Sequence, residues 1–284
     1  MPDTSTLPKC CLIGESVAGN PSHFMIERAF ESAALDWRFL TFEINARRLG
    51  EALAGADALG MQGVLLLGPL REAVGGVYQP LTDRARRSGS ATCLTREEDR
   101  LVADDLTGEA AVNALADATP LAGRRVLLLG AARVAHSLAD AALAAGAQHL
   151  LVADRNLESA GKLAAALGEA FPESAVAAAD WDEGPLDLDE PADVIISSAC
   201  WPDPRDEEFA CAVAEALPAA KAVLDARVGT ARTPLAHLAE DASVPVVDGL
   251  EILARETALA VEYWTGVKVD RVGLRESAEE FLGI

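Results

Sequence analysis

Residues 126–154, VLLLGAARVAHSLADAALAAGAQHLLVAD, decide the fold class of this chain. An apolar run, Val126–Leu129, ends at Gly130, and an alanine-rich stretch with helical composition follows over Val134–Ala145. A glycine ends that stretch, and a second apolar run leads to Asp154. This order of strand, glycine turn, helix and strand predicts a βαβ unit with parallel strands.

The turn after the first strand occupies the position of a dinucleotide-binding loop. In such units the pyrophosphate binds backbone N–H groups at the helix N-terminus, and an acid ending the second strand binds the ribose. Gly130 takes the place of the first glycine and Asp154 that of the acid. Ala132 stands where a second glycine is expected, and Arg133 offers a charge to the pyrophosphate. The alternative is a unit of this fold that has lost its nucleotide.

The rest of the chain also alternates between strand and helix patterns, which predicts an α/β protein. In the first hundred residues the alternation predicts a mostly parallel sheet. Before the βαβ unit we expect strands at Lys9–Gly14, Trp37–Ile44 and Gly63–Leu67, and helices at His23–Ala34 and Arg47–Ala58. After it we expect helices at 157–167, 249–264 and 276–282, strands at 175–179, 194–197, 223–225 and 244–247, and a solvated acidic loop at Asp180–Asp193.

Composition narrows the possible functions. Half of the 284 residues are hydrophobic, and the formal net charge is −21. Such a negative surface repels phosphate backbones and anionic lipids, so we expect neither nucleic acid nor a membrane as partner. No signal peptide is visible, which favours a cytoplasmic protein. The five cysteines lack metal-ligand spacing and are expected to be reduced thiols, so no metal is expected.

Several segments together resemble the shikimate dehydrogenase family over nearly the whole chain. The late segments are the best preserved, with Thr233–Leu235 matching a T-P-L signature and Gly249–Gly266 matching a G-L-x-M-L…W-T-G signature. The earlier matches are Gly14–Ser22 to the substrate segment, Gly63–Glu72 to N-V-T-I-P-H-K-E, Ala103–Ala110 to G-Y-N-T-D-G, Gly130 onward to G-A-G-G, and Asp154–Asn156 to N-R-T.

This resemblance implies two domains with the active site between them. Residues 1–108 and 248–284 would form an α/β substrate domain on which the C-terminal helices pack. Residues 109–247 would form a Rossmann-type domain with a doubly wound parallel sheet. The implied activity is hydride transfer between a nicotinamide cofactor and a cyclic hydroxy acid. For this chain we expect NAD(P), a small hydroxy or keto acid, and a monomer or homodimer.

The cofactor contacts follow residue by residue from the same resemblance. They are Gly130, Ala131, Ala132, Arg133, Val134, Asp154, Arg155, Asn156 and Ser197. Asp154 would repel a 2′-phosphate, which favours NAD, whereas the neighbouring Arg155 keeps NADP possible.

On the substrate side, the family's paired serines correspond to Asn20 and Ser22, and a late tyrosine corresponds to Val228. Asn20 and Ser22 can still hydrogen-bond a carboxylate or hydroxyl. Ser22 is equally well explained as a helix N-cap.

The family's catalytic lysine corresponds to Arg71, and three polar positions before it are Leu65, Leu67 and Leu70. Polar substrate groups facing leucine would stay unpaired, at a cost of about 1–3 kcal/mol each, so shikimate is not expected to be the substrate. Arg71 can polarise a carbonyl or hold a carboxylate but cannot pass on a proton. The alternative is a surface arginine paired with Glu72 or another acid.

The proton must therefore come from another residue. The family's aspartate corresponds to Thr107, with Asp105 just before it, and the family's glutamine corresponds to Glu256. A partly buried Glu256 would suit proton transfer. It could equally form a salt bridge with Arg71, or lie exposed beside Arg255.

Two functions remain open. One is an NAD(P)-dependent dehydrogenase with a changed substrate. The other is a non-catalytic member of the same fold that acts as a ligand sensor or protein partner, because the lysine, the aspartate and the second glycine are all replaced.

Overall fold

The structure is a computed structural model that describes residues 7–131, 134–181, 186, 188, 190–199, 213–229 and 232–284. Its contacts divide the chain into two compact units. Unit 1 comprises Met1–Leu106 and Leu253–Ile284, and unit 2 comprises Thr107–Ile252.

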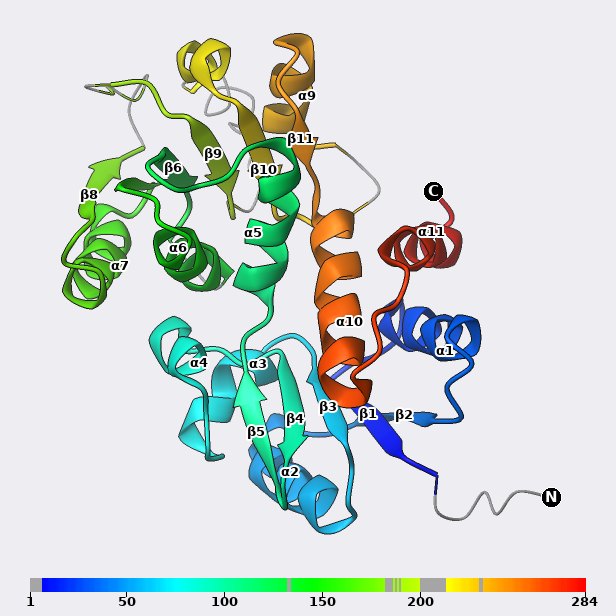
Figure 1. Ribbon diagram of the computed structural model, residues 1–284. Coiled ribbons are helices and arrows are strands. Elements are labelled where there is room, and N and C mark those ends of the chain that lie inside the picture. Colours follow the sequence, from blue (N-terminus) through cyan, green and yellow to red (C-terminus); the bar gives the residue numbers. More distant parts are fainter. Residues whose placement is uncertain are drawn as a thin grey trace. The chain divides into compact units, whose positions relative to one another are not determined.

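Unit 1 contains a mixed five-stranded sheet with the order β2-β1-β3-β4-β5 (Figure 1). The strands are β1 (Lys9–Gly14), β2 (Arg38–Glu43), β3 (Gly63–Leu66), β4 (Cys93–Glu97) and β5 (Arg100–Asp104). β1 runs parallel to β2 and β3, whereas β4 is antiparallel to both β3 and β5. β5 therefore runs in the same direction as β1, β2 and β3, so the expected mostly parallel sheet is confirmed and β4 alone among these five strands runs the opposite way. The β4–β5 turn uses Glu98 at φ 55° and Asp99 rather than the glycine or asparagine that usually signals a hairpin.

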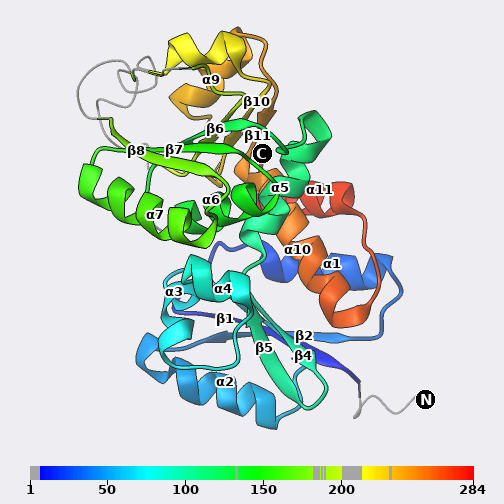
Figure 2. The ribbon, with the colours of Figure 1, turned by 60° about the vertical axis from the view of Figure 1, so that its left-hand side comes forward.

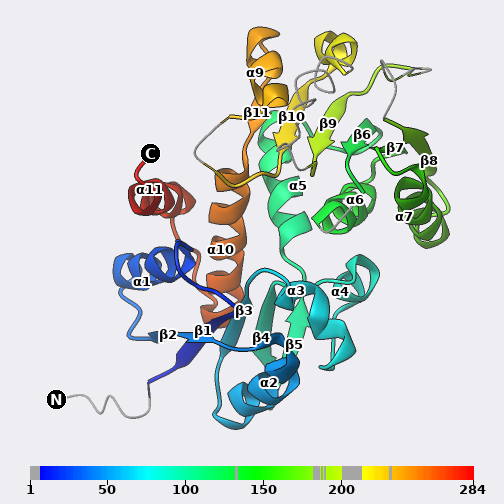
Figure 3. The same ribbon diagram turned by 180° about the vertical axis from the view of Figure 1, so that it is seen from behind.

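Helices cover both faces of this sheet (Figures 1 and 3). Leu49 and Leu53 of α2 pack with Cys11, Ile13 and other residues of one face. On the other face, the ring of Trp264 in α10 lies against Phe39 of β2. The helices of this unit are α1 (Ser22–Ser32), η2 (Ala46–Arg48), α2 (Leu49–Ala58), α3 (Leu70–Ala73), η3 (Val74–Gly76), α4 (Asp83–Ser88), α10 (Gly249–Thr265, which begins in unit 2) and α11 (Arg271–Leu282).

Residues of the late sequence signatures hold each unit together. The indole of Trp264 donates to the carbonyl of Leu94 at 3.0 Å and fills the space over Gly63, where a Cβ would lie 2.1 Å from its nitrogen. In unit 2 the hydroxyl of Thr233 accepts from the N–H of Ala236 and donates to Asp225. Packing and helix capping are therefore sufficient to explain why Trp264 and Thr233 occur at these positions.

Unit 2 contains a six-stranded parallel sheet with the order β11-β10-β9-β6-β7-β8. The strands are β6 (Arg125–Leu129), β7 (His149–Asp154), β8 (Ala175–Asp180), β9 (Val194–Ser197), β10 (Ala222–Asp225) and β11 (Val246–Val247). The predicted doubly wound Rossmann-type sheet is confirmed, because strand order reverses between β6 and β9.

Helices lie on both faces of the parallel sheet (Figure 2). α6 and α7 lie on one face, while Leu235 and Ala239 of α9 pack into the core of the other. The helices are α5 (Thr107–Ala118), α6 (Val134–Ala144), α7 (Leu157–Ala170), η4 (Ala214–Ala219) and α9 (Pro234–Asp241).

The ends of the acidic stretch belong to the fold rather than to a solvated loop. Asp180 closes β8, and Trp181 is buried. Asp193 accepts from the ammonium of Lys221 at 2.7 Å and from the backbone N–H of Arg125 at 3.0 Å. The prediction was wrong at both ends because hydropathy alone does not show where an acid finds its cation.

The described cysteines are buried and free. Burial raises the pKa of both Cys11 and Cys93 to about 12, so their thiols stay protonated at neutral pH. Cys200 and Cys211 lie outside the described residues. Among the helices that are described, none is long and apolar enough to cross a bilayer.

Candidate functional site

The predicted nucleotide loop leaves β6 at Gly130. This glycine has φ 93°, and a Cβ there would lie 2.8 Å from Ser198 Oγ. Both observations exclude a side chain at this position. Ser198, which sequence analysis did not single out, donates its hydroxyl to the carbonyl oxygen of Leu129 at 3.1 Å. In the sequence, the only signal for Ser198 was the Ser197-Ser198 pair at the end of the β9 strand pattern.

Asp154 ends β7 and binds the loop directly. Its Oδ2 accepts from the N–H of Ala131 at 2.7 Å, and its Oδ1 accepts from the N–H of Asn156 at 2.7 Å. Each carboxylate oxygen keeps a second lone pair for another donor. Asp154 therefore fixes the loop against β7 while it can still accept further hydrogen bonds.

Other predicted cofactor residues surround this loop. Asn156 caps α7 by accepting from the N–H of Ser159, and the guanidinium of Arg155 lies 6.0 Å from the ring centre of Trp181. Ala131 and Ser197 are buried, and Val134 begins α6. Ala132 and Arg133 lie outside the described residues.

His136 lies in the first turn of α6, next to the same loop. Burial lowers the pKa of its imidazole below the ordinary value of 6.5, and a hydrogen bond with the backbone of Ala131 opposes this shift. The ring is therefore expected to be neutral at physiological pH.

In unit 1, Ser22 lies at the start of α1. Ser22 is only 1% exposed, and its hydroxyl has no hydrogen-bond partner among the residues that the structure describes. The N-cap interpretation was wrong, because Pro21 occupies that position and no side chain caps the helix. The oxygen of the Asn20 side chain instead accepts from the N–H of Ser22 at 2.9 Å. A buried hydroxyl without a partner costs free energy, so this group calls for a ligand or another functional explanation.

Arg71 and Glu256 form a buried ion pair although 185 residues separate them. Nη2 of Arg71 lies 2.7 Å from Oε1 of Glu256, and the side chains are 24% and 5% exposed. Nε of Arg71 donates to the carbonyl of Leu66 at 2.8 Å. The alternatives of a surface arginine paired with Glu72 and of an exposed Glu256 were therefore wrong, and the salt-bridge alternative is confirmed.

The direction of α10 places this pair at the carboxyl end of β3. Trp264 covers Gly63 at the start of the strand, and Arg71 reaches Glu256 from the carbonyl of Leu66 at its end. The eight residues from Glu256 to Trp264 span about 12 Å of helix, and the three from Gly63 to Leu66 span about 10 Å of strand. The two segments are therefore of similar length, and Glu256 lies near the end of β3 when Trp264 lies at its start. β1 is parallel to β3, so Ser22, which follows β1, belongs to the side of the sheet where both strands have their carboxyl ends.

The remaining predicted residues have different environments. Asp105 is buried, and its N–H donates to Asp104, which itself binds Thr82 and Arg84. Leu65 and Leu67 are also buried. Thr107, which begins α5, and the half-exposed Val228 belong to unit 2.

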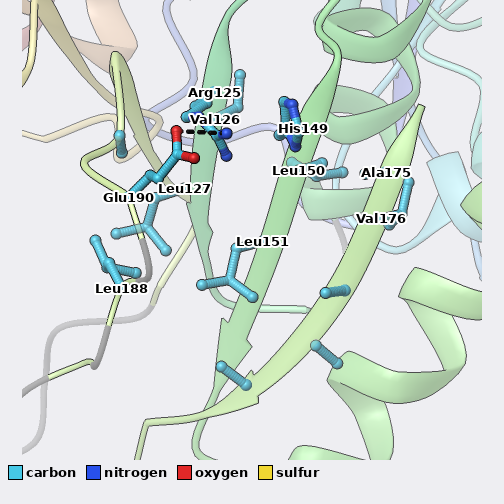
Figure 4. A pocket seen from close by; sticks show the side chains of 14 residues that line it. Arg125, Val126, Leu127, His149, Leu150, Leu151, Ala175, Val176, Leu188 and Glu190 are labelled. Atoms are coloured by element: carbon cyan, nitrogen blue, oxygen red, sulfur yellow. Dashed lines mark ion pairs between the residues drawn. The ribbon is translucent and has the colours of Figure 1, made fainter.

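A hollow of about 440 Å³ lies on one face of the unit 2 sheet (Figure 4). Arg125 and Glu190 form an ion pair at its rim, beside His149. Arg125 and His149 begin β6 and β7, so the hollow lies towards the amino ends of these strands. Ligands of doubly wound sheets bind at the carboxyl ends, which excludes this hollow as the predicted nucleotide site.

Comparisons with known proteins agree with this architecture. No family model matches the chain. It is 32% identical over 257 residues to an NADP⁺ shikimate dehydrogenase of Anaeromyxobacter sp., which covers 90% of each chain. A Thermus thermophilus shikimate 5-dehydrogenase, solved with NADP(H) and shikimate, is 25% identical with a TM-score of 0.79, and the match covers 97% of this chain and all of that one. The 5-ketofructose reductase of a Gluconobacter species shares the fold, with 24% identity, a TM-score of 0.87 and coverage of 96% and 98%.

The Rossmann-type unit and the mixed α/β unit, together with the relative that is 32% identical, place the chain in the class of two-unit α/β oxidoreductases. Within that class the chain belongs to the shikimate dehydrogenase family.

Proposed function

We propose that this protein is a dehydrogenase that transfers hydride between NAD and a small hydroxy or keto acid other than shikimate. The observation that carries the proposal is the buried pair of Arg71 and Glu256 at the carboxyl end of β3. A buried cation paired with a carboxylate at the carboxyl end of a strand can transfer a proton and stabilise a charge that develops on the substrate.

The unpartnered hydroxyl of Ser22 supports an acid as substrate. Ser22 begins α1, an eleven-residue helix whose first turn contains no acidic residue. The N-terminus of such a helix carries a partial positive charge that favours an anion. A substrate carboxylate there would accept the hydrogen bond that Ser22 lacks.

Arg71 and Glu256 divide the chemistry of alcohol oxidation. Arg71 stays charged and stabilises the oxygen as it becomes an alkoxide. Glu256, which pairs with Arg71, accepts the proton of the substrate hydroxyl while the hydride leaves the carbon that bears this hydroxyl. Reduction is the reverse, with the proton returned from Glu256 to the carbonyl oxygen. Asp105 is the second candidate for this proton.

The substrate differs from shikimate because leucines replace polar residues near Arg71. Leu65, Leu67 and Leu70 are all buried and offer no hydrogen bond to a hydroxyl-rich ring. That a 5-ketofructose reductase has the same fold supports the view that this fold accommodates other substrates.

The residues around Gly130 fit a dinucleotide. Gly130 allows the positive φ of the turn, α6 offers a helix N-terminus, and Asp154 keeps acceptor sites for ribose hydroxyls. The nicotinamide supplies the hydride-accepting carbon when it is bound. The carboxylate of Asp154 favours NAD over NADP by repelling a 2′-phosphate.

The experiment measures nucleotide binding and turnover separately. Calorimetry should detect NADH with higher affinity than NADPH, and a panel of 2- and 3-hydroxy acids should reveal NAD⁺ reduction. In the Ser22→Ala variant, KM for the acid should rise while thermal stability stays the same or increases, because a buried unpaired hydroxyl is removed. Ser277→Ala is the matched control, since the buried hydroxyl of Ser277 already donates to the Gly273 carbonyl.

A result without nucleotide binding would end the dehydrogenase proposal. Binding without turnover of any acid would instead favour the non-catalytic alternative, a ligand sensor or protein partner. The specific observation in its favour is that Arg71 and Glu256 already satisfy each other. Turnover that Arg71→Ala abolishes would exclude this alternative.

A further inference from the structure

The hollow on the unit 2 sheet has an apolar floor that three neighbouring strands provide (Figure 4). In the register of the sheet, Leu127 of β6 lies beside Leu151 of β7, and Leu151 lies beside Ala177 of β8. Alternate residues of a strand share a face, so Ala175 and Ala179 continue this floor along β8. The three strands therefore present one continuous hydrocarbon surface.

Small side chains on β8 keep this surface hollow. Both faces of a parallel sheet are normally covered, and strands buried on both faces usually carry large aliphatic residues. β8 instead places Ala175 and Ala177 on this face, and both are exposed. Leu188 packs against the core of the same face and lines the hollow. The space of about 440 Å³ is in the range of sites that bind small molecules.

The rim of the hollow carries charge. Arg125 and His149 lie side by side at the amino ends of β6 and β7. A guanidinium can hold a carboxylate by two hydrogen bonds, and an imidazole has at least one N–H donor in either charge state. Glu190 pairs with Arg125 here, but its side chain is 61% exposed. Because exposed ion pairs contribute little stability, the carboxylate of a ligand can replace that of Glu190.

Away from this rim the hollow is entirely aliphatic. Its other lining residues are all alanine, valine or leucine. They offer no polar side chain to a ligand, so the part of the ligand that lies there is hydrocarbon. From Ala175 at the rim to Ala179, β8 extends about 13 Å, which is the length of an extended chain of about ten carbons.

We propose that this hollow binds a straight-chain alkanoate of about eight to ten carbons. The carboxylate binds Arg125 and His149, and the chain lies over β7 and β8. β6 and β7 begin at the hollow and lead to Gly130 and Asp154 at their other ends. The alkanoate site is therefore separate from the predicted nucleotide loop, and it does not depend on the dehydrogenase proposal.

Calorimetry with octanoate tests the ligand class. Octanoate should bind with a dissociation constant of about 1 mM or lower, because the hollow buries several of its methylene groups. Hexanoate should bind about tenfold more weakly, since it buries two methylene groups fewer. Octanol has the same chain without the charge and should also bind about tenfold more weakly. Octylammonium should bind no more tightly than octanol.

Two variants test the position of the ligand. Arg125→Gln should weaken octanoate binding about tenfold, whereas the matched control Arg232→Gln, which breaks an exposed pair with Glu240, should not change it. Ala177→Leu should weaken binding about tenfold by filling the hollow, whereas Ala165→Leu, at an exposed position of α7 on the other face, should not. Melting temperatures measured without ligand verify that each variant is folded.

Three results would overturn the proposal. The first is no binding of octanoate at millimolar concentration. The second is octylammonium binding as tight as octanoate binding, since Glu190 would then be the recognising group. The third is octanoate binding that neither Arg125→Gln nor Ala177→Leu weakens, or that NADH displaces, because the ligand would then lie at another site. If NADH does not bind at all, the dehydrogenase proposal fails, while the octanoate result still decides this one.

Discussion

Replacing Arg71 by methionine tests how much the buried ion pair with Glu256 contributes to the free energy of unfolding. The change removes the charge and keeps most of the apolar stem. It leaves the carboxylate of Glu256, whose side chain is 5% exposed, without its cation. Two charges 4 Å apart attract by about 4 kcal/mol at an effective dielectric constant of 20 but only about 1 kcal/mol in water. We expect Arg71→Met to cost about 3–5 kcal/mol of unfolding free energy.

The opposite change should cost less. Glu256→Leu leaves Arg71 without its carboxylate, but that side chain is 24% exposed and still donates to the carbonyl of Leu66. Partial hydration limits the penalty to about 1–3 kcal/mol. The double variant contains no stranded charge and should recover most of the loss, because apolar residues often replace a buried ion pair at little cost.

Urea unfolding, with hydrogen exchange to separate unit 1 from unit 2, measures these differences. The matched control is Arg48→Met, which breaks a 2.8 Å pair with Glu51 whose side chains are 70% and 69% exposed. That change should cost about 0–1 kcal/mol. If Arg71→Met is no more costly than Arg48→Met, or if the double variant is no more stable than Arg71→Met, the reasoning is refuted.

Three further predictions concern the rest of the fold. Gly63→Ala should destabilise unit 1 by about 1–3 kcal/mol, because the added Cβ would lie 2.1 Å from the Trp264 nitrogen. Gly55→Ala, which adds a Cβ in open space in α2, should stabilise unit 1 by about 0.5–1 kcal/mol. The midpoints of urea unfolding compare the two variants. Ala132→Gly should tighten NADH binding in calorimetry if the loop accepts a pyrophosphate, and equal affinities would contradict this. The folded chain protonates His136 less readily than the unfolded chain, so stability should fall as pH decreases through about 6.5, and melting temperatures should fall less in His136→Gln.

The sequence alone identified most of the elements. The βαβ unit around Gly130 and the parallel strands of unit 2 were predictable because buried parallel strands are continuous apolar runs bounded by glycine. The β4–β5 hairpin was not predictable from local signals, since its turn places Glu98, a residue that rarely has positive φ, in that conformation.

The sequence also named Arg71 and Glu256 as candidates but left their environment open. Salt bridge, exposed residue and independent acid were all compatible with the local pattern. Only the path of α10, fixed by Trp264 over Gly63, brings Glu256 to the end of β3. That choice depends on packing between distant segments.

Ser22 shows the same limit in the other direction. Its sequence context suits an N-cap, but the backbone places Pro21 at that position and buries the hydroxyl without a partner. Hydrophobic periodicity and glycine positions determined the fold of this protein, because they act locally along the chain. Burial and ion pairing decided the site, because they depend on which distant residues the fold brings together.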